Sequence, residues 1–165
     1  MPLTIGPLHV RRSIFVQAPP ARVWEHFIDE EAICGWFDQG HKVHTFEPRV
    51  GGVVSMSIDI DGELNHYGGA VLEVDPEAEI SFETQWEGER AWAVPTFWTI
   101  RLTAIYGGTL VEIYHHGFER LGVGAADALE GYEHGWNIQH LASLRSIVES
   151  SKQVVSSKQV VSSKE

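Results

Sequence analysis

The sequence contains a single cysteine, Cys34, among its 165 residues, so no disulfide can form within the chain. Because disulfides are common in secreted domains and rare in reducing compartments, this scarcity favours a cytoplasmic location. A lone cysteine beside Ile33 and Trp36 is interpreted as a small buried hydrophobic side chain rather than as a nucleophile. The fold must therefore be held by packing alone, which a chain of this length can achieve as one domain.

Basic residues and long apolar runs are also scarce. The chain has 12 Lys and Arg against 23 Asp and Glu, which gives a formal net charge of −11. This balance repels phosphate backbones and anionic lipid headgroups, so we expect neither nucleic acid nor a membrane surface as a partner. No stretch reaches the roughly 18 apolar residues of a membrane-spanning helix, and residues 1–7 lack the pattern of a secretory signal.

The common motifs for nucleotide binding, metal binding and serine hydrolysis are missing. The sequence has no GxGxxG, GxxxxGK[ST], GxSxG, CxxC or HExxH. Its nine histidines do not form an obvious ligand set, because His115 and His116 are adjacent in an expected strand and face opposite sides. His134 and His140 lie about 120° apart around an expected helix. We therefore predict no metal and no other cofactor.

The residue pattern in the middle of the chain predicts an antiparallel sheet. From His41 onward apolar and polar residues alternate, and turn signals recur at regular intervals. The dipeptide Asp61-Gly62 between two alternating runs is the firmest hairpin signal. Strands are expected at 8–18, 41–47, 52–60, 64–74, 79–86, 96–104 and 109–116. One face of the sheet should be dry and the other wet, with Ser57 among the polar residues of the wet face, so the dry face needs a cover.

Three helices are expected outside the sheet. A double proline, Pro19 and Pro20, introduces a short helix over 21–29, and a second short helix covers 30–37. The longest helix covers 125–150. Its apolar side carries Leu129, Trp136, Leu144, Ile147 and Val148 at helical spacing, wide enough to bury against the sheet.

Two polar residues share the apolar side of that long helix. Glu133 and His140 project into the same stripe, one turn before and one turn after Trp136. A helix that only packs against a sheet does not need them, so they are candidates for a functional site. On one continuous helix they would lie about 10.5 Å apart along the axis, too far to touch directly.

The end of the chain is a low-complexity tail. The hexapeptide SKQVVS at 151–156 recurs at 157–162, and a third copy begins at 163. We interpret residues 1–150 as a single domain and 151–165 as a flexible extension. The alternative is a helical extension whose valine pairs dock on a neighbouring molecule, which would make the protein a homodimer.

The order of elements and several motifs resemble a known superfamily. The motifs are APPARVW at 18–24, PRVGG at 48–52, DG at 61–62, GGAVLEVDP at 68–76, GGTLVEIYHHGF at 107–118 and HGW at 134–136. Over residues 8–149 they resemble the START-like SRPBCC superfamily, in the branch related to the activator of the 90-kDa heat-shock-protein ATPase. The resemblance implies an α+β helix-grip fold: a strand, two short helices, six antiparallel strands and a C-terminal helix packed over the sheet.

The resemblance also implies a cavity between the sheet and the C-terminal helix. Mainly apolar and aromatic walls with a few polar groups are typical of a ligand site. The residues expected to line it are Trp36, Phe37, Met56, Ile58, His66, Leu72, Phe82, Trp86, Trp98, Ile100, His115, Glu133, Trp136 and His140. A leucine is usual one turn after the helix tryptophan in similar sequences, where this chain has His140, so the pocket should be more polar.

The cavity and the family resemblance leave three functions open. The first is binding of an apolar or aromatic small molecule. The second is an enzyme of cyclase, dehydratase or hydrolase type, in which His115, His140 and Glu133 act as acid and base and Glu133 orients an imidazole. The third is a co-chaperone-like interaction module with a chaperone partner. If Glu133 instead meets water at the cavity mouth and His140 bonds a backbone carbonyl, neither residue has a functional role.

Overall fold

The computed structural model describes residues 3–37 and 40–162, with residues 151–162 described by backbone alone. In chain order its elements are β1 (His9–Val16), α1 (Pro20–Trp24), η1 (Glu25–Phe27), α2 (Glu30–Cys34), β2 (His41–Phe46), β3 (Val53–Ile60), β4 (Glu63–Asp75), β5 (Glu79–Trp86), η2 (Gly88–Arg90), β6 (Thr96–Ile105), β7 (Gly108–His116), η3 (Phe118–Gly124), α3 (Ala125–Gly135) and α4 (Gln139–Ser162). No described helix is long and apolar enough to cross a membrane.

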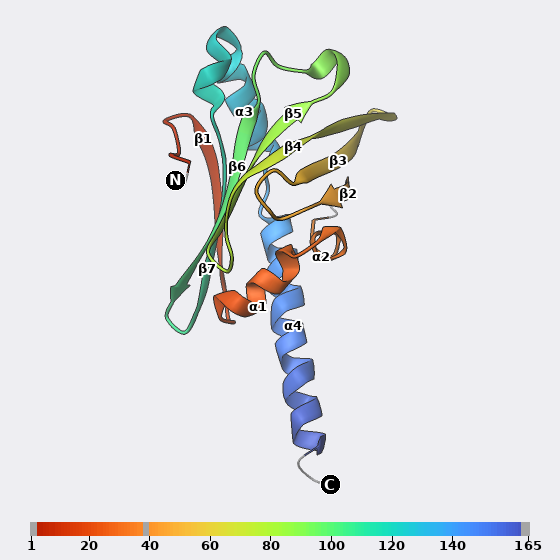
Figure 1. Ribbon diagram of the computed structural model, residues 1–165, viewed down its shortest axis with the longest axis vertical. Helices are drawn as coiled ribbons and strands as arrows, with labels where there is room; N and C mark the ends of the chain where they lie inside the picture. The colour runs from red at the N-terminus through yellow and green to blue at the C-terminus, as the bar shows by residue number, and fades with distance from the viewer. Residues whose placement is uncertain (1–2, 38–39, 163–165) are drawn as a thin grey trace.

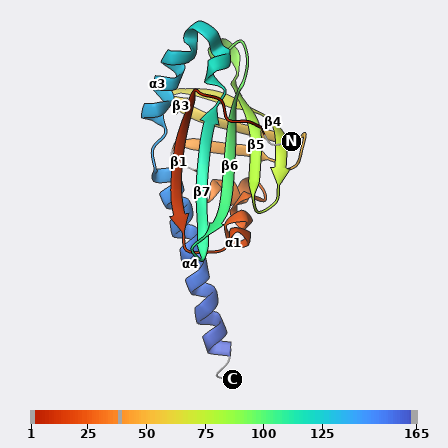
Figure 2. The ribbon, with the colours of Figure 1, turned by 90° about the vertical axis from the view of Figure 1, so that its left-hand side faces the viewer.

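The strands form one antiparallel sheet in the order β1-β7-β6-β5-β4-β3-β2. Figure 1 shows this sheet curving around one side of the molecule, and Figure 2 shows α3 and α4 running along the β1 side of it. Its inner face supplies most of the hydrophobic core, which α1, α2 and α4 help to close. The predicted α+β helix-grip fold is confirmed.

The hairpin between β3 and β4 turns where the sequence indicates. Asp61 and Gly62 have φ angles of 53° and 84°, the two positive values that a two-residue type I′ turn requires. The Asp59 carboxylate accepts a hydrogen bond from the Gly62 amide at 2.8 Å and fixes the turn.

A β-bulge in β4 changes which residues face the core. The register of β4 against β5 shifts between Val71 and Glu73, so Leu72 is the extra residue. Val71 is 1% exposed, whereas Leu72 is half-buried and stands outside the core. The expected inward position of Leu72 is therefore wrong, because strict alternation across a bulge assigns the wrong face.

The expected continuous helix over 125–150 is interrupted. α3 ends at Gly135, Trp136 has an extended backbone (φ −76°, ψ 110°), and α4 begins at Gln139. The Arg12 guanidinium of β1 donates to the carbonyl oxygens of Glu133 and Trp136 at 2.9 and 3.1 Å, so it satisfies the end of α3.

The start of α4 is fixed by a local side chain. The Asn137 side chain accepts from the Gln139 amide at 2.8 Å, in the manner of an N-cap. Beyond the sheet, α4 continues away from the body of the molecule (Figure 1). The predictions for the 151–165 tail, flexibility or docking on a second copy, concern side chains and a terminus that lie outside the described residues.

Cys34 does not have the environment expected for it. Its side chain is exposed and its sulfur contacts the Val43 carbonyl at 3.5 Å. The reason is that α2 is only one short turn, so Ile33 takes the buried position and Cys34 faces outward. The expectation of a buried cysteine is wrong.

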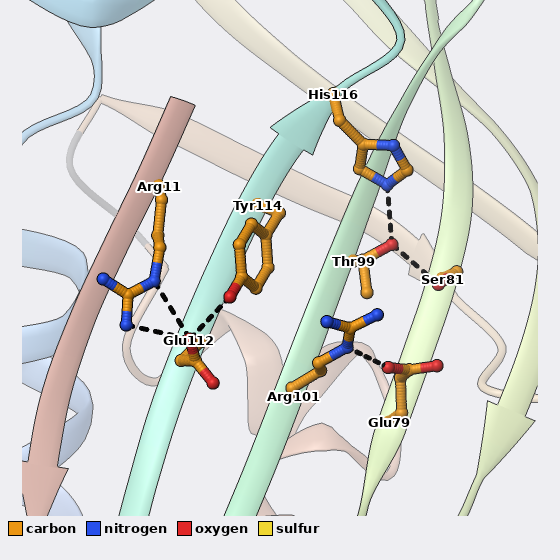
Figure 3. A network of polar contacts seen from close by, with 8 residues as sticks. All are labelled: Arg11, Glu79, Ser81, Thr99, Arg101, Glu112, Tyr114 and His116. Atoms are coloured by element: carbon orange, nitrogen blue, oxygen red, sulfur yellow. Dashed lines mark hydrogen bonds and ion pairs between the residues drawn. The ribbon is translucent and has the colours of Figure 1, made fainter. Parts of the chain in front are cut away.

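The outer face of the sheet is polar, as expected, but parts of it are buried. Ser57, predicted to be wet, is fully buried and bonds to His44 Nε2 at 2.8 Å. Figure 3 shows a second polar network, on β5, β6 and β7. There the Thr99 hydroxyl contacts Ser81 at 2.8 Å and His116 Nε2 at 2.7 Å. All three are almost fully shielded from solvent.

Charged side chains lie beside this polar network. Arg11 donates to Glu112 at 2.9 Å, and the Tyr114 hydroxyl donates to the same carboxylate at 2.6 Å (Figure 3). Arg101 pairs with Glu79, and its guanidinium lies 5.4 Å from the Tyr114 ring centre. The charges on this face are therefore balanced by neighbouring residues, which leaves no net basic patch there.

Candidate functional site

A cavity of about 350 Å³ lies between α3 and the inner face of the sheet. This volume is at the lower end of the range for small-molecule sites. The lining residues are Phe37, His41, Ile58, Ile60, Tyr67, Thr84, Trp86, Trp98, His115, Asp127, Ala128, Gly131, Tyr132, Gly135, Trp136 and His140. They come from β2 to β7, from α3, from the start of α4 and from the segment after α2, so the site exists only in the folded chain.

The structure brings together half of the predicted site. Phe37, Ile58, Trp86, Trp98, His115, Trp136 and His140 line the cavity. Four other predicted residues, Trp36, Met56, Phe82 and Ile100, instead surround a void of only about 10 Å³ deeper in the core. They are close-packed, so they support the wall from behind, as in the Phe82–Trp98 ring contact at 5.3 Å.

Two predicted residues lie away from the cavity. His66 is on the outer face of β4, where its ring lies 5.6 Å from that of His44. Glu133 is half exposed on α3 and lies 3.5 Å from Arg12. The single stripe expected to hold Glu133 and His140 is wrong, because the helix is interrupted between them.

His115 is held by two hydrogen bonds within the protein. The Trp136 indole N–H donates to its Nδ1 at 3.1 Å, and its Nε2 bonds to the Thr96 hydroxyl at 2.8 Å. Nδ1 must therefore be the unprotonated nitrogen and Nε2 carries the proton. Complete burial, with His116 nearby, holds the pKa of His115 well below its ordinary value, so the ring is neutral.

His115 and Trp136 are thus in direct contact, but Glu133 does not orient an imidazole as predicted. Both ring nitrogens of His115 are committed to Thr96 and Trp136, and Glu133 pairs with Arg12 instead. His115 therefore positions the indole of Trp136, which is also packed edge-on against Trp98 at 4.9 Å.

A second pair of polar residues lines the cavity on the β2–β4 side. The Tyr67 hydroxyl and His41 Nδ1 are 2.6 Å apart, and burial followed by the proximity of His140 lowers the pKa of His41 to about 4. His140 stacks on Phe37 at 4.3 Å and lies 5.6 Å from the His41 ring. The cavity therefore holds polar side chains on its β2–β4 side, next to its aromatic walls.

Sequence reasoning missed His41, Tyr67, Thr84 and Tyr132. The signal for Tyr67 was present: counting by twos from Val71 places Tyr67 inward and His66 outward, as found. Counting from Leu72 across the bulge gave the opposite result. The spacing of Ala128 and Tyr132, four residues apart, could likewise have marked the inner side of α3.

Acidification should destabilise the protein through its buried histidines. Burial lowers the pKa of His41 and His116 from an ordinary value of 6.5 to about 4, and it holds the pKa of His115 well below the same ordinary value. Below pH 6.5 the unfolded chain binds protons at these positions while the folded chain does not, so stability is complete above pH 6.5 and falls as the pH drops toward 4.

Urea unfolding at pH 7 and pH 5 measures this effect. The midpoint should be lower at pH 5, and His116→Gln should reduce the difference between the two pH values because it removes one of the three groups. An equal midpoint at both pH values would contradict the assignment of neutral, buried imidazoles.

The curved sheet, the closing helices and the cavity between them define a helix-grip protein of the SRPBCC type. The chain belongs to the family of activator of Hsp90 ATPase homolog 1-like proteins, whose family model matches residues 17–149. The family resemblance identified from the sequence motifs is confirmed.

Solved structures agree with this assignment. A protein of Chromobacterium violaceum is 25% identical, with 87% of this chain and 99% of that chain covered and a TM-score of 0.66. A protein from Arthrobacter aurescens is 17% identical (90% and 92% covered, TM-score 0.68), and one from the dynemicin biosynthetic locus is 19% identical (87% and 48% covered, TM-score 0.59). The latter two show the fold alone. A comparison with curated proteins gives no match.

Proposed function

We propose that this protein binds a compact apolar or aromatic small molecule in the cavity between the sheet and α3. The observation that carries the proposal is a pocket of about 350 Å³ between α3 and the sheet, partly open to solvent and lined mainly by aromatic and aliphatic side chains. Such a lining with a few polar groups is typical of a small-molecule site. A ligand that fills the pocket removes these apolar surfaces from water.

The arrangement of the polar groups supports binding more than acid–base catalysis. A general base must offer a nitrogen or carboxylate to the ligand, and His115 has both nitrogens bonded within the protein. Glu133 points to solvent beside Arg12. The third predicted catalytic residue, His140, lines the cavity with its ring stacked on Phe37 at 4.3 Å and 5.6 Å from the His41 ring. A cyclase, dehydratase or hydrolase therefore has less support.

Filling the cavity should abolish binding. Ala128 lines the cavity from α3, so the indole of Ala128→Trp occupies the space that the ligand needs. Affinity for N-phenyl-1-naphthylamine, a neutral aromatic fluorophore, should fall at least about tenfold. Ala126→Trp is the matched control, because Ala126 is on the same helix, is exposed and lies outside the cavity.

The titration is followed by probe fluorescence, with the fold checked by circular dichroism. Equal affinities of the wild type, Ala128→Trp and Ala126→Trp would place the probe elsewhere and contradict the proposal. Native mass spectrometry of the purified protein tests it independently, since a retained small molecule should be lost in Ala128→Trp and kept in Ala126→Trp.

Membership of the family of Hsp90 ATPase activator homologues supports a second candidate, contact with a chaperone. Addition of the protein to purified Hsp90 tests this candidate directly. A rise in the ATPase rate that survives Ala128→Trp would assign the activity to a surface and separate it from the cavity.

A further inference from the structure

The charge of the cavity lining restricts the kind of ligand that it can hold. Among the described lining residues no Lys or Arg is present, and Asp127 is the one carboxylate, exposed on α3. Two of the three lining histidines, His41 and His115, are neutral because burial disfavours their charged forms, and the third, His140, stacks on Phe37. A ligand carboxylate or phosphate would therefore find no Lys or Arg partner among the described lining residues, which makes its burial costly.

The Tyr132 hydroxyl is a neutral donor in the cavity wall. The Trp86 indole N–H donates to the Tyr132 hydroxyl oxygen at 3.0 Å, and both residues line the cavity. The Tyr132 oxygen is thus an acceptor for Trp86, and its own proton remains to be donated. Among the described residues the structure gives this proton no acceptor, so the donor is available to a ligand.

The position of this donor is fixed by packing. The Tyr132 ring lies edge-on to His115 at 4.4 Å and contacts Phe118 at 5.5 Å and Trp92 at 5.9 Å. Burial raises the pKa of Tyr132 to about 12, so the phenol keeps its proton at any physiological pH. The Thr84 hydroxyl also lines the cavity, but no described contact fixes its direction.

We infer that the cavity selects an uncharged aromatic ligand that carries a carbonyl-type oxygen, and that Tyr132 donates the hydrogen bond to this oxygen. The inference rests on the proposed function and names its ligand class. The body of the ligand packs among the rings of Trp86, Trp98 and Trp136, while the oxygen replaces the water that would otherwise accept from Tyr132.

Three probes of matched shape test the inference. These are 2-acetylnaphthalene, which has a carbonyl acceptor, 2-isopropylnaphthalene, which has none, and 2-naphthoate, which is anionic. Each displaces N-phenyl-1-naphthylamine from the full chain at pH 7. The ketone should bind at least about a hundredfold more tightly than the carboxylate, because the described lining residues offer the carboxylate no Lys or Arg. Equal or tighter binding of 2-naphthoate would overturn the charge argument.

Two variants locate the donor. Tyr132→Phe keeps the ring and removes the hydroxyl donor. It should weaken the binding of 2-acetylnaphthalene about tenfold and change the affinity for 2-isopropylnaphthalene by less than about twofold. Thr84→Val, the control for the other hydroxyl, should leave the preference between the two probes unchanged. The hydrocarbon also reports whether the cavity of each variant is still formed.

The possible results separate the two proposals. If Tyr132→Phe weakens both probes equally, Tyr132 has a general packing role and the inference is wrong. If Thr84→Val causes the selective loss instead, the donor has been assigned to the wrong residue. If the hydrocarbon binds and the ketone gains nothing from Tyr132, the proposed function stands without the inference. If no probe displaces the fluorophore and Ala128→Trp has no effect, both fail.

Discussion

Replacement of Trp136 by alanine should lower the free energy of unfolding by about 3–5 kcal/mol, the usual cost of truncating a large buried aromatic side chain. Trp136 is 8% exposed and packs against Trp98 at 4.9 Å and Phe37 at 6.2 Å. Its removal would enlarge a cavity that is already present, and it would leave His115 Nδ1 without its donor. Both effects lower the free energy of unfolding.

A set of three variants divides this cost between packing and hydrogen bonding. Trp136→Phe keeps much of the ring but loses the N–H, so it should cost about 1–3 kcal/mol, the penalty for an unsatisfied buried acceptor. Tyr106→Ala removes an aromatic ring that is 89% exposed and should change stability by less than about 0.5 kcal/mol. Urea unfolding gives all three values. A loss below about 1 kcal/mol for Trp136→Ala would contradict its role as an anchor.

A methyl group at Gly68 should lower the free energy of unfolding by nearly as much. Gly68 has a φ of +150°, and a Cβ there would lie 2.0 Å from the Val54 carbonyl oxygen of the neighbouring strand. Because the obstacle is backbone, it cannot move without opening the pairing of β3 and β4. Gly68→Ala should therefore destabilise the fold by about 2–4 kcal/mol.

Gly131 is the matched control for this substitution. It lies within α3, and a Cβ there would meet no atom within 4 Å. Gly131→Ala should stabilise the protein by about 0.5–1 kcal/mol, since alanine loses less backbone entropy in a helix. The same chemical change is thus expected to have opposite signs at the two positions. Thermal and urea unfolding would refute this explanation if both variants shifted in the same direction.

The sequence correctly predicted the features that depend on short-range interactions. The Asp61-Gly62 turn, the prolines before α1 and the alternation in β3, β5, β6 and β7 depend on residues close together in the chain. The apolar faces of the strands and helices also indicated a sheet with helices packed over one face. Seven of the residues expected in the site do line the cavity.

The errors arose where a distant residue decides the outcome. Arg12 of β1 satisfies the carbonyls at the end of α3, and this contact is separated from Glu133 by more than a hundred positions. The bulge at Leu72 depends on the pairing of β4 with β5 and not on the residues of β4 alone. One such shift was enough to exchange Tyr67 for His66 in the predicted site.

The sequence by itself determined the strands and short helices, their order, the family and an inner face rich in aromatic residues, because periodicity and turn chemistry are local properties. The tertiary structure alone decided where space remains between those residues. A cavity is what packing leaves unfilled, so it depends on the relative positions of α3 and the sheet. That arrangement brings Tyr132 next to Trp86 and His41 next to Tyr67, pairs that no spacing in the sequence connects.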